Sequence, residues 1–483
     1  MKNTLACFGL AFLVALLLPA GSSAQSTGDD AAAKIASKKK KKKKKSKKKA
    51  KAKVEQSSTE DDTLDKKYSA DVKEKPAKRY FRFEFKRHPA IRMGKWFRMD
   101  FRLKFQHDFR SFGPEVSTDE GELSNLRKFR VGIQGYVTKD FEYEIEREIR
   151  DDISDLFHLR DRPTLALWRD VYGNWRYFRK AQIRAGQFKI PFGMDQLHNS
   201  GFVYRSLIGN FLAPGREVGI MAHGKLFDSR IAYQAGLFEH DGWKAHTKDH
   251  GRSGEGTFAG RVVLPPFNLF KTPAFLRKAK DLELGFAFTE SPLTEGLRSL
   301  RGRTWVITHN WFDRINVRGH RLRLGGELNW QPGPFTVQGE VIRVRDQRLG
   351  QGIRGEDLPD LIARGWYFTT GWVVTGEKPA GGIVPRRDFI KGRGLGAVQL
   401  AARYEQLRFG SSEHPGLPSR SSRAANIFST SERIATFGTN WYPNRFVTVQ
   451  FNAIREVLED PNNAPIPGVD TYWSKFVRIQ FSF

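Results

Sequence analysis

Apolar and polar residues alternate with a period of two from about residue 95 to the end of the chain. In the first such segment the odd positions from Phe97 to Phe105 are apolar, and the even positions from Arg98 to Gln106 are polar. Similar segments begin near residues 126, 140, 319 and 395. Successive side chains of a β-strand point to opposite faces, so the pattern predicts strands with one apolar and one polar face.

Short polar turns and long charged stretches separate these segments. Tight turns are expected at 138–140, 227–229, 331–334 and 442–444. Long loops are expected at 108–125, 240–255, 346–361 and 407–430. A transmembrane barrel has short turns on one side of the membrane and long loops on the other. The sequence therefore predicts an all-β fold, a transmembrane antiparallel β-barrel over residues 95–483.

The barrel is expected to contain about sixteen strands. They begin near residues 96, 126, 140, 164, 180, 217, 229, 256, 280, 319, 334, 362, 395, 431, 445 and 472. Segments 80–87 and 304–312 also have a strand-like pattern and would raise the number to eighteen. An even number places both ends of the barrel on the short-turn side.

The last strand ends in alternating aromatic and aliphatic residues. Trp473, Val477, Ile479, Phe481 and Phe483 alternate with polar residues. A lipid-facing strand that closes on a terminal Phe resembles the signal read by the outer-membrane assembly machinery. We therefore expect Phe481 and Phe483 to form this assembly signal.

The N-terminus has the features of an export signal. Lys2 precedes an apolar run from Leu5 to Leu18, and small residues up to Ala24 follow, which predicts a signal peptide over residues 1–24. The run is too short to span a bilayer. Cys7 is the single cysteine and lies within the signal, so no disulfide, cysteine metal site or cysteine nucleophile is expected in the mature chain.

Residues 25–79 are expected to be a disordered, lysine-rich periplasmic tail, because eight consecutive lysines at 38–45 repel one another and offer no core. Lysine clusters also attract nucleic acid, but export favours a tail that contacts the membrane surface or periplasmic polymers, and no nucleic-acid partner is expected. Residues 80–94 are expected to form a linker or plug-like segment.

The barrel itself is basic. The chain has a net charge of +29, and residues 80–483 retain 61 basic against 44 acidic residues. A basic lumen with low-dielectric walls concentrates anions. The alternation predicts that the following basic residues face the lumen: Arg98, Arg102, Lys104, Lys128, Arg130, Arg184, Arg321, Arg323, Arg403 and Arg478.

Several motifs resemble the phosphate-selective porin O and P family. They are the segment from Ala185 to Gly193, the segment from Ala213 to Gly219, and the later segments 233–238, 325–330 and 333–340. The resemblance covers roughly residues 95–483. It implies a sixteen-stranded barrel, usually a homotrimer, in which one loop folds inward to narrow the pore.

The loop after Gly193 is the natural candidate for that constriction. Asp195, His198 and Tyr204 are its expected constriction residues, and Lys189, Arg205 and Arg216 are added to the candidate pore-lining cations. The resemblance does not establish phosphate as the substrate.

An acidic row, Glu142, Glu144, Glu146 and Glu148, faces the same lumen. It is expected to pair with Lys128, Arg130 or their neighbours and to stiffen the wall. For any one basic residue, an ion pair within the wall and contact with a permeant anion remain equally supported alternatives.

The sequence thus favours a passive outer-membrane channel for phosphate or other small anions in a Gram-negative-type bacterium. The alternative is a structural anchor whose lysine-rich tail contacts the cell wall. The expected partners are small anions, outer-membrane lipid, the assembly machinery and further copies of the chain. No Ser-His pair suited to catalysis is evident, and His198 and His223 lack metal-ligand spacing. We expect neither an enzyme, nor a cofactor, nor a metal.

Overall fold

The computed structural model describes residues 81–85, 88–113, 124–149, 168–198, 207–227, 230–242, 256–269, 279–296, 300–304, 309–389, 394–411, 414 and 416–483. The expected signal peptide and lysine-rich tail, residues 1–79, lie outside the described residues.

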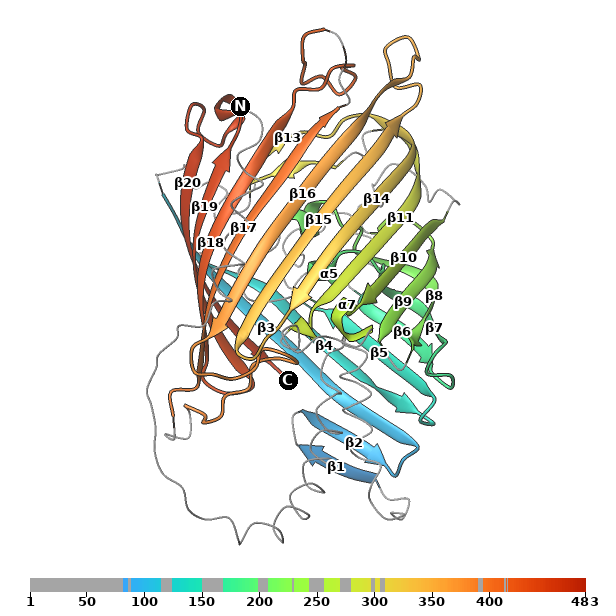
Figure 1. The fold of residues 1–483 in the computed structure, drawn as a ribbon, viewed down its shortest axis with the longest axis vertical. Coiled ribbons are helices and arrows are strands. Elements are labelled where there is room, and N and C mark those ends of the chain that lie inside the picture. Colours follow the sequence, from blue (N-terminus) through green and yellow to red (C-terminus); the bar gives the residue numbers. More distant parts are fainter. Residues whose placement is uncertain are drawn as a thin grey trace, which may run out of the picture. The chain divides into compact units, whose positions relative to one another are not determined.

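Sixteen antiparallel strands form a closed barrel (Figure 1). Each strand pairs with the next one along the chain, and β20 closes the ring by pairing with β3. The first eight are β3 (Phe97–Gly113), β4 (Ser124–Val137), β5 (Phe141–Glu148), β6 (Trp168–Trp175), β7 (Gln182–Lys189), β8 (Arg216–Leu226), β9 (Ile231–Phe238) and β10 (Thr257–Leu264). The others are β11 (Glu283–Gly296), β14 (Val317–Trp330), β15 (Phe335–Arg348), β16 (Leu358–Val373), β17 (Ala397–Ser411), β18 (Thr430–Tyr442), β19 (Val447–Leu458) and β20 (Thr471–Ser482).

The two faces predicted for each strand are present. In β16, Trp366, Phe368 and Trp372 are 41%, 50% and 44% exposed on the outer face. The intervening Tyr367 and Thr369 are buried on the inner face. The closed ring contains sixteen strands with this alternation of faces, so the prediction of an all-β barrel with about sixteen strands is confirmed.

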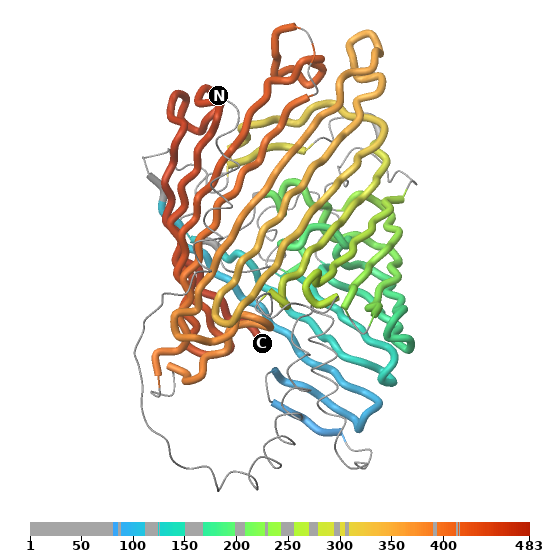
Figure 2. The backbone as a smooth tube through the Cα atoms, in the orientation of Figure 1, coloured from blue at the N-terminus to red at the C-terminus, as the bar shows by residue number. Residues whose placement is uncertain are grey.

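The strand connections are short at one end of the barrel and long at the other. Residues 138–140 and 331–334 form tight turns, whereas 349–357 and 416–429 extend beyond the strand ends (Figure 2). Two connections on the short-turn side, 265–282 and 374–396, are longer, and the first contains α7 (Pro266–Leu269). No helix in the described ranges is long and apolar enough to cross a membrane.

Four strands lie outside the ring. β1 (Phe81–Phe85) and β2 (Pro89–Met93) form a hairpin, and β2 pairs with the first residues of β3. The expected strand at 304–312 is instead part of the long loop between β11 and β14. There β12 (Gly302–Arg303) and β13 (Asn310–Phe312) form a small separate sheet.

The loop between β7 and β8 folds into the barrel, as predicted. It contains α5 (Met194–His198) and α6 (Leu207–Phe211). Ile208 and Leu212 are fully buried beside Gly365 on the inner face of β16. The glycine is required there because a Cβ on it would lie 2.5 Å from Ile208 Cγ2. The loop therefore packs against the opposite wall and narrows the lumen.

This packing predicts that Gly365→Ala destabilises the folded protein. The added methyl group overlaps Ile208 and Leu212, and overpacking of this kind costs about 1–3 kcal/mol. The free energy of unfolding in guanidinium, measured on barrels refolded in detergent, tests this. Gly339→Ala is the matched control, because a Cβ there meets its first atom, Tyr367 O, at 3.5 Å. Equal free energies for the two variants would contradict the packing of the loop on β16.

Candidate functional site

Polar contacts anchor the inward loop, here called the constriction loop (residues 190–215), to three strands across the lumen, β14, β15 and β17. Arg323 Nε on β14 donates to Leu212 O at 2.7 Å. The backbone N–H of Asp195 donates to the Glu340 carboxylate on β15 at 3.2 Å. The Asp195 carboxylate lies 3.4 Å from Arg403 Nη1 on β17. The Arg403 guanidinium stacks over the ring of Tyr367 on β16, 3.7 Å from its centroid.

A buried cluster of charged side chains links the residue after β9 to strands β14 and β15. Asp241, just after β9, accepts hydrogen bonds from Arg321, at 2.7 Å, and from Arg323. Arg321 also makes a two-pronged contact with Asp346, at 2.6 and 2.5 Å. Burial alone would raise the pKa of the Asp241 carboxyl, but the two guanidinium groups outweigh burial and hold that pKa well below its usual range. Asp241 therefore remains charged throughout the physiological pH range.

A second loop, described at residues 300–304 and 309–316, also fills part of the lumen. Its Phe312 stacks on Phe409 of β17 with ring centroids 4.4 Å apart. Its Trp311 Nε1 donates to Glu432 of β18 at 2.8 Å. Both aromatic side chains belong to one buried apolar cluster with Ile208 and Leu212 of the constriction loop. Two loops thus bury apolar side chains against part of the inner wall between β14 and β20.

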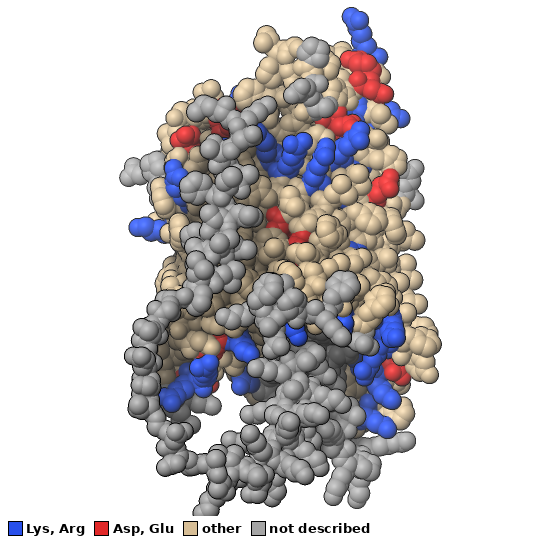
Figure 3. Space-filling view, in the orientation of Figure 1, with Lys and Arg blue, Asp and Glu red and all other residues tan. Residues whose placement is uncertain are grey.

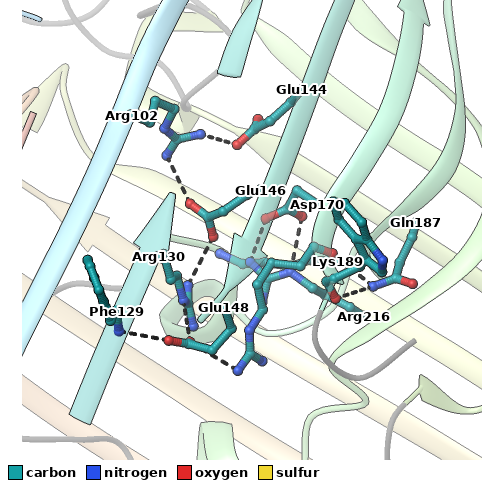
Figure 4. Close-up of polar contacts among 12 residues, drawn as sticks. Arg102, Phe129, Arg130, Glu144, Glu146, Glu148, Asp170, Gln187, Lys189 and Arg216 are labelled. Carbon is teal, nitrogen blue, oxygen red and sulfur yellow. Dashed lines mark hydrogen bonds and ion pairs between the residues drawn. The ribbon is translucent and has the colours of Figure 1, made fainter. Parts of the chain in front are cut away.

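The opposite wall, from β3 to β8, carries a dense polar network (Figure 4). Arg130 contacts Glu146 at 3.2 Å and Glu148 at 2.7 Å. Arg102 pairs with Glu144 and lies 3.8 Å from Glu146. The expectation that the acidic row pairs with Arg130 and neighbouring cations is met for these arginines.

The same network continues onto the next strands. Arg169 on β6 contacts Glu148 at 3.1 Å. Arg216 on β8 donates two hydrogen bonds to the Asp170 carboxylate on β6, at 3.1 and 2.6 Å. These arginines have most of their charge balanced by a carboxylate in the wall.

Lys104 and Lys128 are different. They are diagonal neighbours on the inner faces of β3 and β4, where Lys104 is opposite Arg130 and Lys128 is opposite Gln106. Within the described part of the chain, neither ammonium group has a carboxylate within 4.0 Å or a hydrogen-bond partner. Arg130, Glu146, Arg102 and Lys189 are the electrostatic neighbours of Lys104, and three of these four are cations.

The structure distributes the remaining sequence candidates along the lumen. Arg98 pairs with Asp100 near the short-turn end, and Arg478 makes a two-pronged contact with Asp108. Arg184 stacks over Tyr172, with 4.3 Å to its centroid. Lys189 donates to Leu197 O at 2.7 Å, and His198 Nδ1 lies 3.0 Å from Met194 O, so both brace α5. Tyr204 and Arg205 lie outside the described residues.

The two expected assembly residues lie together at the short-turn end. The rings of Phe481 and Phe483 are 5.8 Å apart, and Phe446 lies 6.4 Å from Phe481. Their role in assembly stays a prediction.

One group of side chains in the described ranges could hold a metal ion. Ligand atoms of Glu217, Glu239 and His240 lie within 4.8 Å of one another at the loop end of β8 and β9. Glu239 is exposed, and His240 Nδ1 already lies 3.8 Å from the Glu217 carboxylate. A buried histidine–glutamate pair accounts for this arrangement without a metal.

Sequence reasoning missed Asp241, Glu340 and Trp311. Period-two alternation placed Arg321 and Arg323 on the lumen face but could not indicate that a loop carboxylate reaches them. The adjacent aromatics Trp311 and Phe312 in a loop rich in Arg were the one available sign of an inward fold.

The Asp241 cluster predicts a large stability loss for Asp241→Asn. The change leaves the buried guanidinium of Arg323 without its carboxylate, and breaking a buried ion pair costs about 3–5 kcal/mol. Guanidinium unfolding at several pH values measures the difference between the two proteins. The difference in the free energy of unfolding should have its full size above about pH 5. It should shrink as the pH falls below about 4, where Asp241 in the unfolded chain takes up a proton.

Asp281→Asn, at an exposed turn residue, is the control and should leave stability unchanged. A difference for Asp241→Asn that grows as the pH falls would contradict a lowered pKa of Asp241.

Comparisons with known proteins agree with this architecture. The family model for the phosphate-selective porin O and P family matches residues 97–483. None of the curated proteins compared with the chain matches it. An anion-selective porin from Comamonas acidovorans is similar at 10% identity and a TM-score of 0.49, covering 80% of this chain and 99% of that one. The outer membrane channel DcaP of Acinetobacter baumannii is similar at 9% identity and a TM-score of 0.46, covering 80% and 98%.

Structural likeness this weak carries no argument, so the assignment depends on the family match and on the barrel itself. That match spans most of the chain and points to a channel rather than an enzyme. The chain therefore belongs to the phosphate-selective porin O and P family and is an outer-membrane porin that favours anions.

Proposed function

We propose that small anions cross this barrel along the β3–β8 wall and are attracted chiefly by Lys104 and Lys128. The observation that carries the proposal is the contrast between these lysines and the arginines around them. Arg102, Arg130 and Arg216 have carboxylate partners, whereas the two ammonium groups have none in the described part of the wall.

The charge balance of the wall supports this assignment. A paired arginine presents little net field, because its carboxylate partner cancels most of its charge at a distance. Two neighbouring ammonium groups have no such partner among the described residues to cancel their field, and low-dielectric walls focus that field into the lumen. The sequence left two alternatives for each basic residue, an ion pair within the wall or contact with a permeant anion. We assign the ion pair to most of the arginines and the anion contact to the two lysines.

The two inward loops support the same path. Their apolar side chains are buried against part of the wall between β14 and β20 and fill that part of the lumen. An anion loses hydration without compensation beside apolar side chains, so the polar β3–β8 wall is the favourable route. A lysine ammonium is a compact point charge that does not require a planar ligand. Such a point charge can attract phosphate and also other small hydrated anions.

The double variant Lys104→Gln/Lys128→Gln should reduce anion preference. We expect the reversal potential in a planar bilayer under a KCl gradient to move toward the cation side. We also expect block of the current by added phosphate to weaken about tenfold, corresponding to about 1.4 kcal/mol of lost attraction.

Lys104→Arg/Lys128→Arg keeps the charge and should retain anion preference. Lys139→Gln, in a short turn outside the lumen, should change nothing. An unchanged reversal potential in the double glutamine variant would refute the two-lysine site.

We further propose that residues 1–24 are a cleaved signal peptide and that the outer-membrane assembly machinery inserts the barrel. The apolar run at 5–18 and the terminal aromatic pair Phe481 and Phe483 support these steps. A homotrimer is the assembly that the family resemblance implies. We propose the boundaries 25–79 for a lysine-rich tail and 95–483 for the barrel domain.

A structural anchor is the second candidate function, because the proposed channel gives the lysine run at 38–45 no role. Deleting residues 25–79 separates the two functions. Single-channel conductance and reversal potential should match those of the full-length protein if the barrel alone is the channel. Loss of conductance in a barrel that still folds would contradict this, and weakened envelope integrity in cells would support the anchor.

A further inference from the structure

Basic side chains form a row on the outer face of the barrel near its long-loop end. They stand on six consecutive strands, β15 to β20, and each is exposed. In Figure 3, blue side chains gather toward the upper end of the visible face, above a broad band with few charges. The members of this outer basic row are Arg343, Arg345, Arg364, Arg408, Arg433, Arg455 and Lys475.

The strand registers place several of these like charges directly beside one another. Arg343 is opposite Arg364 in the β15–β16 pair, and Arg364 is opposite Arg408 in the β16–β17 pair. Side chains opposite one another in an antiparallel pair have Cβ atoms about 4.5–5.5 Å apart, and like charges there are destabilising. Three guanidinium groups in a line therefore favour a negatively charged ligand between them.

The carboxylates around the row do not balance it. Arg345 pairs with Asp360, and Arg408 lies 2.7 Å from Glu459. Within the described residues, the other five members have no ion-pair or hydrogen-bond partner. The outer basic row thus keeps a clear excess of positive charge.

Aromatic and aliphatic side chains lie directly below the row, toward the short-turn end. Trp366 follows two residues after Arg364 on β16, and its ring lies 5.6 Å from that of Tyr404. Phe437 and Phe451 are 60% and 47% exposed on the same outer face. Aromatic residues are enriched at the level of lipid headgroups, where apolar and aqueous regions meet. The long loops of outer-membrane barrels are extracellular, so this position corresponds to the headgroup level of the outer leaflet or just above it.

We propose that the outer basic row binds phosphate groups of phosphorylated glycolipid headgroups in the outer leaflet of the membrane. The arginine fork matches phosphate oxygens with two hydrogen bonds, and several such forks in a line span more than one phosphate. The acyl chains of the same lipid extend onto the apolar band below. This site lies on the outer face and is separate from the lysines of the lumen.

Binding of lipid A to the full-length protein in detergent, measured by native mass spectrometry or by titration with a fluorescent lipid A, tests the proposal. The triple variant Arg343→Gln/Arg364→Gln/Arg433→Gln removes three charges without breaking an ion pair of the described structure. We expect lipid A to bind this variant about tenfold more weakly or worse, as for loss of several surface phosphate contacts. Lipid A without its phosphates should bind the wild-type protein equally weakly.

The matched control is Arg179→Gln/Lys180→Gln/Arg387→Gln, which removes three exposed charges from the short-turn end. It should bind lipid A as the wild-type protein does. Heat-dependent migration in gels and unchanged anion conductance show that each variant is folded, and they separate this proposal from the lysine site of the channel.

Unchanged lipid A affinity in the triple variant would overturn the proposal, as would equal binding of lipid A without phosphates. A fall in the oligomeric state with lipid A affinity retained would also overturn it. That result would assign the row to a contact between copies of the chain.

Discussion

Closure of the sheet between β20 and β3 is the constraint on which the rest of the structure depends. In lipid, no water satisfies the backbone N–H and C=O groups of a sheet edge, so a strand can span the membrane only inside a closed ring. A closed ring has just two surfaces. One must suit lipid, and the other is free to be polar, which is the origin of the period-two sequence.

The inner surface is itself divided. From β14 to β20 two inward loops bury Ile208, Leu212, Trp311 and Phe312 against the wall, as in the core of a soluble protein. From β3 to β8 the wall stays polar, and its arginines and carboxylates balance one another. The proposed path of the permeant ion depends on this division, and the buried Asp241–Arg323 pair helps to maintain the division by holding the loop wall in place.

The basic residues of the barrel therefore fall into four groups. Buried arginines such as Arg321 and Arg403 hold loops in place, paired arginines such as Arg130 stiffen the wall, and the two lysines are the cations that we propose to attract anions. Outward arginines such as Arg364 form a fourth group that faces the lipid boundary. A net charge summed over the chain cannot separate these roles, because all four groups contribute the same sign.

The sequence by itself predicted the barrel, about sixteen strands with eighteen as the alternative, and the face that each strand residue takes, and the family resemblance indicated which loop narrows the lumen. These features follow from local alternation and from short-range motifs such as the segment ending at Gly193. It did not determine that Asp241 contacts Arg323, that Trp311 and Phe312 pack inside the barrel, or that Lys104 lacks the carboxylate that Arg130 has. Those outcomes depend on contacts between residues far apart in the chain, and only the closed ring brings such residues within reach of one another.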